Sequence, residues 1–363
     1  MANNFKIYQT FDKGDVISGK NNTVSNGFFP GNSATFLQSL LRTDSDQKQL
    51  TGSNGAYDVL NGLYYTNVYD GVSSEKQLLF SISYGDFDGG GVRTGSVFQN
   101  TKAIYSQFSN VLLGIADEDG KFSFKSGSAA TNTYVTSSHV YVIAFSSNLM
   151  NDQIDKGQWA FAFDGTSGSA DLHVIDETPL LTAAERKEQR LVYQIVSGSF
   201  NVDSGVTVAT ADYQGIGLFY PKNGVMVLNA DVVKTLCGVN HDTGSNSSFH
   251  VDNSVRLYNS MAAVGNRNMR VRKSEIVPST HYFVRVKNQD FNFSNNPSFV
   301  YPENVSGSLK GEIITSLVDD PKTYVTTVGL YNETNELIAV AKLSQPVRKD
   351  FISELNVRIR LDF

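Results

Sequence analysis

The strongest constraint on the fold is an alternation of apolar and polar residues close to the end of the chain. The apolar positions are Leu355, Val357, Ile359 and Leu361, and the polar ones are Asn356, Arg358, Arg360 and Asp362. Successive side chains of a β-strand point to opposite faces, so this segment is predicted to be a half-buried strand. Chain ends fray unless something ties them down, and we therefore expect this strand to be paired within a sheet.

Two apolar segments before this strand predict a β-hairpin. Residues 324–331 are rich in β-branched and aromatic side chains with a period of two, which is typical of a strand. Residues 337–342 form an apolar run short enough to be a buried strand. The polar segment between them, residues 332–336, consists of residues that favour turns.

The rest of the chain predicts more strands and a few short helices. Strands are expected at residues 5–11, 16–17, 78–84, 139–145, 158–163, 191–195, 216–219 and 225–228. Helices are expected at residues 96–113, with Ser96 as N-cap, at 229–238 and at 253–265, and a shorter one follows the capping box of Thr182 and Glu185. The predicted fold class is mainly β with α/β elements, built from mixed and antiparallel sheets.

Breaks rich in glycine divide the chain into three expected regions. Residues 1–84 are predicted to hold the N-terminal strands and an arm, and residues 85–168 a helix packed on a sheet. Residues 169–363 are predicted to form a β-rich C-terminal region. Its last strands are expected to join the N-terminal sheet, because strand edges left open invite aggregation.

Composition narrows the range of functions. The net charge is −6, and only 18% of the residues are charged, which argues against a nucleic-acid groove lined with Lys and Arg. The single cysteine, Cys237, allows no intrachain disulfide. The first residues lack a signal-peptide pattern, and no apolar run approaches the roughly 18 residues that span a bilayer, so synthesis in a cytoplasm and no membrane role are expected.

Local motifs for chemistry all lack a residue that they need. His241–Asp242 and His250–Asp252 are pairs that could hold a metal, but they lie in a polar loop where such residues gather freely. The acidic segments starting at Asp86 and Asp117 lack the glutamate that completes an EF-hand, and are better interpreted as turns. No phosphate loop, nucleophile elbow or local triad is complete. The sequence thus predicts no catalytic residue, no metal and no cofactor.

The most basic segment contains Arg267, Arg270, Arg272 and Lys273. On a strand, Arg270 and Arg272 would share one face while Met269 and Val271 occupy the other. That polar face could bind an acidic neighbour or simply be solvated, and the sequence favours neither. Together with the polar face of the last strand, it supplies the candidate interface residues Arg270, Arg272, Arg358, Arg360 and Phe363.

Long strings of the sequence resemble a known protein family. The run YVTTVGLYNETNELIAVAKLSQPVRKDFISELNVRIRLDF and the upstream HYFVRVKNQDFNFSNNPSFV resemble the C-terminal region of virion structural proteins from T4-type contractile-tailed bacteriophages, common in phages of cyanobacteria. The resemblance continues in FKIYQTFDKGDVISG, KAIYSQFSNVLL and HVYVIAFSSNLMNDQIDKGQWAFAF. It implies a non-enzymatic component of the tail baseplate wedge.

This resemblance also implies partners and a location. The expected partners are other tail and baseplate proteins and further copies of the chain, with no nucleic acid and no membrane. The expected location is the virion, assembled in the bacterial cytoplasm. The alternative is a receptor- or glycan-binding β-protein of a tail fibre, since such proteins share this composition and its 17 tyrosines.

Overall fold

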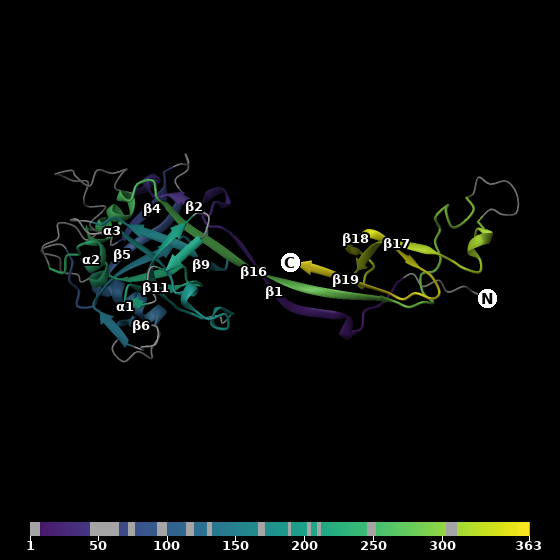
Figure 1. The fold of residues 1–363 in the computed structure, drawn as a ribbon, viewed down its shortest axis with the longest axis horizontal. Coiled ribbons are helices and arrows are strands. Elements are labelled where there is room, and N and C mark those ends of the chain that lie inside the picture. The colour runs from purple at the N-terminus through teal and green to yellow at the C-terminus, as the bar shows by residue number, and fades with distance from the viewer. Residues whose placement is uncertain are drawn as a thin grey trace. The chain divides into compact units, whose positions relative to one another are not determined.

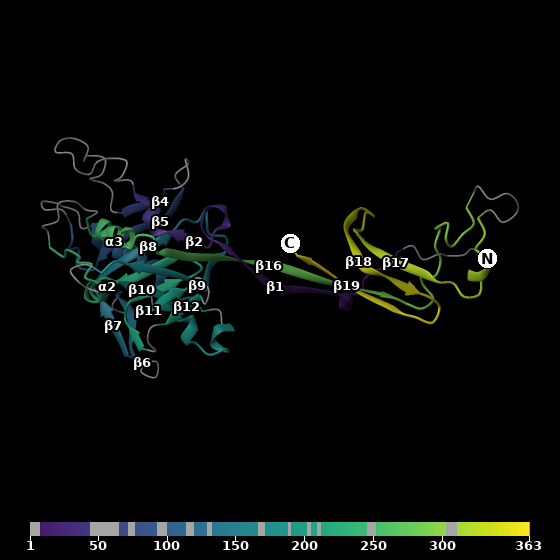
Figure 2. The ribbon, with the colours of Figure 1, turned by 45° about the horizontal axis from the view of Figure 1, so that its top comes forward.

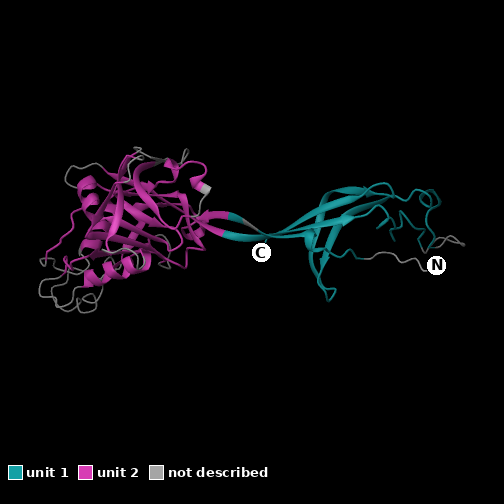
Figure 3. Cartoon of the chain, turned by 90° about the horizontal axis from the view of Figure 1, so that it is seen from below, with its two compact units in different colours: residues 1–23, 276–363 teal, residues 24–275 magenta. Residues whose placement is uncertain are grey.

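The computed structural model divides the chain into two compact units. Unit 1 comprises Met1–Thr23 and Ile276–Phe363, and unit 2 comprises Val24–Glu275 (Figure 3). The structure describes residues 8–43, 65–71, 77–92, 100–113, 120–128, 133–165, 171–187, 190–201, 205–208, 212–244, 252–302 and 311–362. The three regions expected from the sequence do not coincide with these units. The described part of the first glycine-rich segment, residues 87–92, is a loop inside unit 2, residues 166–168 lie outside the described residues, and unit 1 combines the two ends of the chain.

Unit 2 is built on one long sheet, in which each strand runs antiparallel to its neighbours (Figure 1). Part of β16 (Asn268–Val286) starts it, and the order continues through β9 (Gln153–Phe163), β10 (Leu172–Asp176), β11 (Tyr193–Asn201), β14 (Gly217–Tyr220), β15 (Val225–Asn229), β8 (His139–Phe145), β5 (Leu78–Asp86), β4 (Tyr65–Asp70) and β3 (Leu41–Thr43). Strands β2 (Thr35–Leu37) and β12 (Gly205–Val208) pair with β16 and β11. A smaller sheet contains β13 (Asp212–Gln214), β6 (Phe122–Ser128) and β7 (Thr133–Ser137).

The central strands of unit 2 are apolar on both faces because both faces are covered. In β8, Tyr141 and Ile143 belong to the main core, while Val140 and Val142 face a second core. Helices α2 (Ala230–Cys237) and α3 (Asp252–Ala263) contribute to the main core. Helix α1 (Asn100–Leu112) and strand β6, which is labelled in Figure 2, supply Tyr105, Phe122 and Phe124 to the second one. This double burial explains the continuous apolar run of β8.

Helix α2 confirms both of its predicted ends, whereas α3 begins at Asp252, so the predicted capping residue Asn253 lies inside the helix. Asn229 caps α2 through its side-chain oxygen, which accepts from the backbone N–H groups of Asp231 and Val232, and Gly238 ends the helix in the left-handed conformation. In α1, Tyr105 is buried, but Val111 is exposed, contrary to the predicted apolar face. The proposed N-cap Ser96 lies outside the described residues. The capping box of Thr182 and Glu185 is present and is followed in the described residues by a 3₁₀ turn, Glu185–Lys187, while residues 188–189 lie outside the described residues.

Unit 1 contains the strands from both chain ends. Strand β19 (Leu355–Asp362) pairs with the second half of β16, and β1 (Val16–Gly27) is also a neighbour of β16. Strands β17 (Thr323–Tyr331) and β18 (Leu337–Lys349) form a separate two-stranded sheet. The alternation predicted for the last strand is confirmed, since Val357 and Ile359 are buried and Arg358 and Arg360 are exposed. The predicted hairpin is confirmed as well.

Candidate functional site

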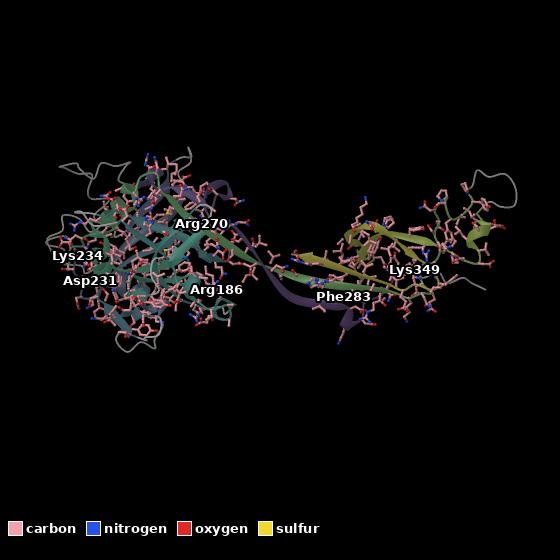
Figure 4. All side chains as sticks on the ribbon, in the orientation of Figure 1. Arg186, Asp231, Lys234, Arg270, Phe283 and Lys349 are labelled. Carbon is pink, nitrogen blue, oxygen red and sulfur yellow. The ribbon has the colours of Figure 1, made fainter. Side chains whose placement is uncertain are left out.

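The predicted interface residues of unit 2 are held by contacts within the chain. Met269 and Val271 are fully buried, so Arg270 and Arg272 share the opposite face of β16, as predicted. Arg270, labelled in Figure 4, donates a hydrogen bond of 2.6 Å to Gln158. Arg272 donates to the hydroxyl and the carbonyl of Ser25 at 3.0 and 3.1 Å. These contacts give both arginines a role in joining β16 to its neighbours.

Two predicted interface residues of unit 1, Arg358 and Arg360, lie on the exposed face of β19. Arg358 donates to His281 at 3.2 Å and lies over the ring of Phe283, with 5.9 Å between the guanidinium carbon and the ring centroid. Arg360 makes two hydrogen bonds, of 2.7 and 2.9 Å, to Asp362. Phe363 lies outside the described residues. This face therefore carries charges that are partly neutralised within the chain.

The β17–β18 hairpin exposes large apolar side chains, which corrects one prediction. Residues 337–342 were predicted as a buried strand, but Leu337, Ile338 and Val340 are more than half exposed. Tyr331 lies beside them, because a Cβ on Gly329 would come within 3.1 Å of the Tyr331 ring and 3.2 Å of Leu337. We call Tyr331, Leu337, Ile338 and Val340 the hairpin patch. A two-stranded sheet has a core on one face only, and the opposite face stays open.

The face of the hairpin opposite the patch packs against the core of unit 1, which explains why the strands carry apolar residues on both faces. Leu330 is buried, and Val328, Ala339, Ala341 and Leu343 pack against the core of unit 1. The outer face gains one aromatic contact, since the Tyr8 ring meets the Tyr331 ring edge-on at a centroid distance of 5.5 Å. Tyr8 is itself half exposed. The patch is thus an apolar surface extended by one tyrosine from the N-terminal segment.

A second feature of chemical interest is a histidine–aspartate cluster in unit 2. It consists of His139 at the start of β8, Asp231 in the first turn of α2 and His241 after that helix, and Figure 4 labels Asp231. His139 Nδ1 lies 3.2 Å from Asp231 Oδ2, and His241 Nε2 lies 3.3 Å from Asp231 Oδ1. One donor atom from each residue lies within 4.8 Å of the others. We call these three residues the His–Asp cluster.

Further polar groups fix the cluster from outside. Asp86 Oδ2 lies 3.5 Å from His139 Nε2, and the other oxygen of Asp86 accepts from the backbone N–H groups of Asp88 and Gly89 at 2.9 Å each. The acidic turn predicted at Asp86 is therefore present. The Ser137 hydroxyl lies 3.0 Å from Asp231 Oδ2. The carboxylates of Asp86 and Asp231 thus each contact one ring nitrogen of His139 and fix the orientation of the ring.

Burial and charge set the protonation of the cluster. Burial lowers the pKa of His241 to about 4, so this imidazole is neutral near neutral pH. Burial alone would raise the pKa of Asp231, but hydrogen bonds from His139 and Ser137 outweigh it and lower the pKa. Burial and the neighbouring Asp86 raise the pKa of Tyr84, whose ring lies 5.9 Å from that of His241. The cluster therefore combines a neutral imidazole with a carboxylate.

Sequence reasoning did not find this cluster because its members are far apart in the chain. The local pair His241–Asp242 is not a joint ligand set: the amide N–H of Asp242 donates to Asn253, and its carboxylate accepts from Gly244. His250 lies outside the described residues. The one available signal was Asn229 as a helix N-cap, which places Asp231 in the first turn of α2. The partners from β8 and the loop after α2 became visible only in the fold.

None of the helices in the described residues is long and apolar enough to cross a membrane. Comparisons with protein-family models, with curated proteins and with solved structures found no match to this chain.

Proposed function

We propose that this protein is a non-enzymatic structural component of a bacteriophage virion, in the tail baseplate wedge, and that it assembles through the hairpin patch. The observation that carries the assembly is the exposure of Tyr331, Leu337, Ile338 and Val340 on the open face of a two-stranded sheet. Contiguous apolar surface of this kind is typical of protein contacts. The virion assignment is supported by the sequence strings that resemble phage structural proteins.

The hairpin needs a cover for a structural reason as well. A two-stranded hairpin alone is at best marginally stable in water, and β17 and β18 pair only with each other among the described strands. Their core-facing side chains are held by unit 1, but the patch contributes no stabilisation while it stays in water. Covering these four side chains would remove apolar surface from water, which stabilises a contact by about 25 cal/mol for each Å² buried.

The charges of the hairpin favour one partner for the hairpin patch, namely the same hairpin of a second copy of the chain. The turn between the strands carries Glu333 and Glu336, while β18 carries the exposed Lys342 farther from the turn, followed by Arg348, which also contacts Asp350 at 2.9 Å. Two hairpins related by a two-fold axis and laid antiparallel would bring the acidic turn of one toward the basic end of the other. The apolar patches would meet between these charges. Homodimer interfaces have this arrangement of an apolar centre and a polar rim.

The test is the oligomeric state of the full chain, measured by size exclusion with light scattering across a dilution series. Wild-type protein is expected to associate, and Ile338→Asp is expected to be monomeric at the same concentrations, because it places a charge in the buried centre of the contact. Val111→Asp is the matched control, since Val111 is an equally exposed apolar residue on α1 of unit 2. A monomeric wild type, or dissociation of both variants alike, would refute self-association through the patch.

The virion role needs a separate experiment. Antibodies against the chain should label purified phage particles at the tail end, and particles with Ile338→Asp should lack the protein or fail to mature. Its absence from particles would overturn the proposal. A hydrolase panel and glycan array test the alternative of a sugar-binding or enzymatic protein. The exposed tyrosines of the described residues, apart from Tyr8 and Tyr331, lie on separate elements, which gives that alternative little support.

A further inference from the structure

We infer that the His–Asp cluster is a binding site for one divalent transition metal ion of the zinc class, a site that local sequence spacing did not predict. The ligands would be His139 Nδ1, His241 Nε2 and one oxygen of Asp231. This inference is independent of the proposed virion function. It concerns unit 2 alone.

The spacing of the donor atoms fits a tetrahedral ion. Zinc bonds to histidine nitrogen and carboxylate oxygen at about 2.0–2.2 Å, so two ligand atoms at the tetrahedral angle lie roughly 3.3–3.6 Å apart. For Asp231 Oδ1, the distances to His139 Nδ1 and to His241 Nε2 are both 3.3 Å, and every pair of donors in the cluster lies within 4.8 Å. Only small side-chain movements are needed to bring all three donors to bonding distance.

The second nitrogen of His139 is oriented as a metal ligand requires. A ligating histidine usually donates its other ring N–H to a carboxylate, which fixes the tautomer and turns the lone pair of the first nitrogen toward the metal. Asp86 occupies this position at 3.5 Å from His139 Nε2 and is itself fixed by two backbone N–H groups. Asp86 is 2% exposed, so this carboxylate is buried, and its Oδ2 atom also accepts from the Tyr84 hydroxyl at 3.5 Å.

The buried His241 gives an independent reason to place a cation here. Its side chain is 2% exposed, and its Nδ1 atom has no hydrogen-bond partner among the described residues. If Nδ1 carries the proton, the lone pair of Nε2 faces the Asp231 carboxylate at 3.3 Å, which is repulsive unless a cation lies between them. If Nε2 carries the proton, Nδ1 is a buried acceptor without a donor. A metal on Nε2 removes the repulsion in the first tautomer.

The donor set identifies the metal class and its role. Two imidazoles and one carboxylate suit zinc and its neighbours, whereas calcium and magnesium prefer oxygen ligands alone. Asp231 is about half exposed and His139 about one quarter, which leaves a path for the ion and room for a water as fourth ligand. The ligands come from β8, from α2 and from the segment after α2. The ion would therefore tie that segment to the sheet.

The test is metal binding by the full-length, tag-free protein after dialysis against a chelator. Zinc chloride alone, titrated by calorimetry, should bind at one equivalent, and cobalt chloride should give the visible absorption bands of a tetrahedral site. His241→Gln should abolish the stoichiometric binding. Asp86→Asn should keep the stoichiometry but weaken the affinity about 10- to 100-fold, as expected for a group that orients a ligand.

His173→Gln is the matched control because this partly buried histidine of unit 2 lies next to Arg267, outside the cluster. It should bind zinc like the wild type. Emission of Trp159, the only tryptophan of the chain and fully buried in unit 2, shows whether each variant is folded. Wild-type protein that binds neither zinc nor cobalt at one equivalent would overturn the inference, and so would folded His241→Gln protein that binds both ions as the wild type does.

Discussion

Among the described residues of unit 1, Lys349 is the most deeply buried charged side chain, and it illustrates how single residues hold this unit. It is fully buried at the end of β18, and its ammonium group donates three hydrogen bonds, to the carbonyl oxygens of Asn288 and Asp350 at 2.7 Å and to the side chain of Asn292 at 2.9 Å. All three donors of the ammonium are therefore used. Lys349 joins the loop after β16 to the end of the hairpin (Figure 4).

Replacing Lys349 by methionine should destabilise unit 1 by about 3 kcal/mol, because three buried acceptors lose their donor while the apolar volume is kept. Lys342→Met is the control, since Lys342 is exposed on the same strand and its replacement should change the free energy of unfolding by less than about 0.5 kcal/mol. Chemical denaturation followed by circular dichroism measures both. Equal stabilities of the two variants would contradict the role given to Lys349.

Asp350 predicts a pH dependence. Hydrogen bonds from Ser353 and Ile352, together with the guanidinium of Arg348 at 2.9 Å, lower the pKa of Asp350 from 3.8 to about 2. The folded state then binds its proton less readily than the unfolded state, so the stabilisation is complete above pH 3.8 and is lost as the pH falls to about 2.

Asp350→Asn should therefore melt below the wild type at neutral pH, with a difference in Tm that shrinks between pH 3.8 and about 2. Melting curves across this interval measure the difference. Asp320→Asn is the control, because Asp320 is an exposed carboxylate of unit 1 whose main contact is Lys322. A Tm difference for Asp350→Asn that stays constant down to the lowest pH would show that the carboxylate charge is not the cause.

At the scale of elements, the sequence predicted what depends on neighbouring residues. The alternation in β19, the caps of α2 and the run of β8 are local patterns, and the structure has all three. Which strands pair with each other depends on residues far apart in the chain, and this was harder to predict from the sequence. The exposure of Leu337 and Ile338 could not be foreseen, because an apolar run does not reveal whether one face of its sheet or both are covered.

Strand β19 should be essential to unit 1. Removing residues 355–363 deletes the buried Val357 and Ile359 and the partly buried Leu355 and Leu361, each worth roughly 1.5–3 kcal/mol when fully buried. Their sum approaches the stability of a whole domain, about 5–15 kcal/mol. The truncated chain is expected to lose unit 1 and its self-association, as measured by protease sensitivity of residues 276–354 and by light scattering.

The double variant Arg358→Ala with Arg360→Ala separates folding from assembly on the same strand. Both side chains are exposed, so unit 1 should fold. Self-association should persist if the hairpin patch is the interface. A well-folded double variant that no longer associates would place the interface on the polar face of β19 instead. A truncated chain that assembles normally would show that β19 is not needed for assembly.

At the scale of the whole molecule, the division into units was the least predictable feature. Residues 1–23 and 276–363 form one unit although 252 residues separate them in the chain. No local pattern contains that information, because it resides in the pairing of β16 with β1 and β19. The His–Asp cluster has the same origin, since His139 lies about ninety positions before Asp231. Both features follow from long-range pairing.

Each unit has its own core, which predicts that the two unfold separately. The core of unit 1 includes Val284, Leu330 and Ile359, and the main core of unit 2 includes Trp159, Phe161 and Phe219. Unit 1 buries fewer large side chains and should unfold first, since stability rises with the apolar area that is buried. Trp159 is the only tryptophan, so its fluorescence reports the unfolding of unit 2 alone.

Calorimetry of the full chain should therefore resolve two transitions, and only the upper one should coincide with the change in Trp159 emission. Lys349→Met should lower the first transition and leave the second in place, because Lys349 lies in unit 1. Phe219→Ala should do the reverse, at a cost of about 3–5 kcal/mol, because the Phe219 ring is fully buried 5.0 Å from that of Trp159. A single transition that both substitutions shift alike would mean that the strands shared by the units, β1 and β16, couple them into one cooperative unit.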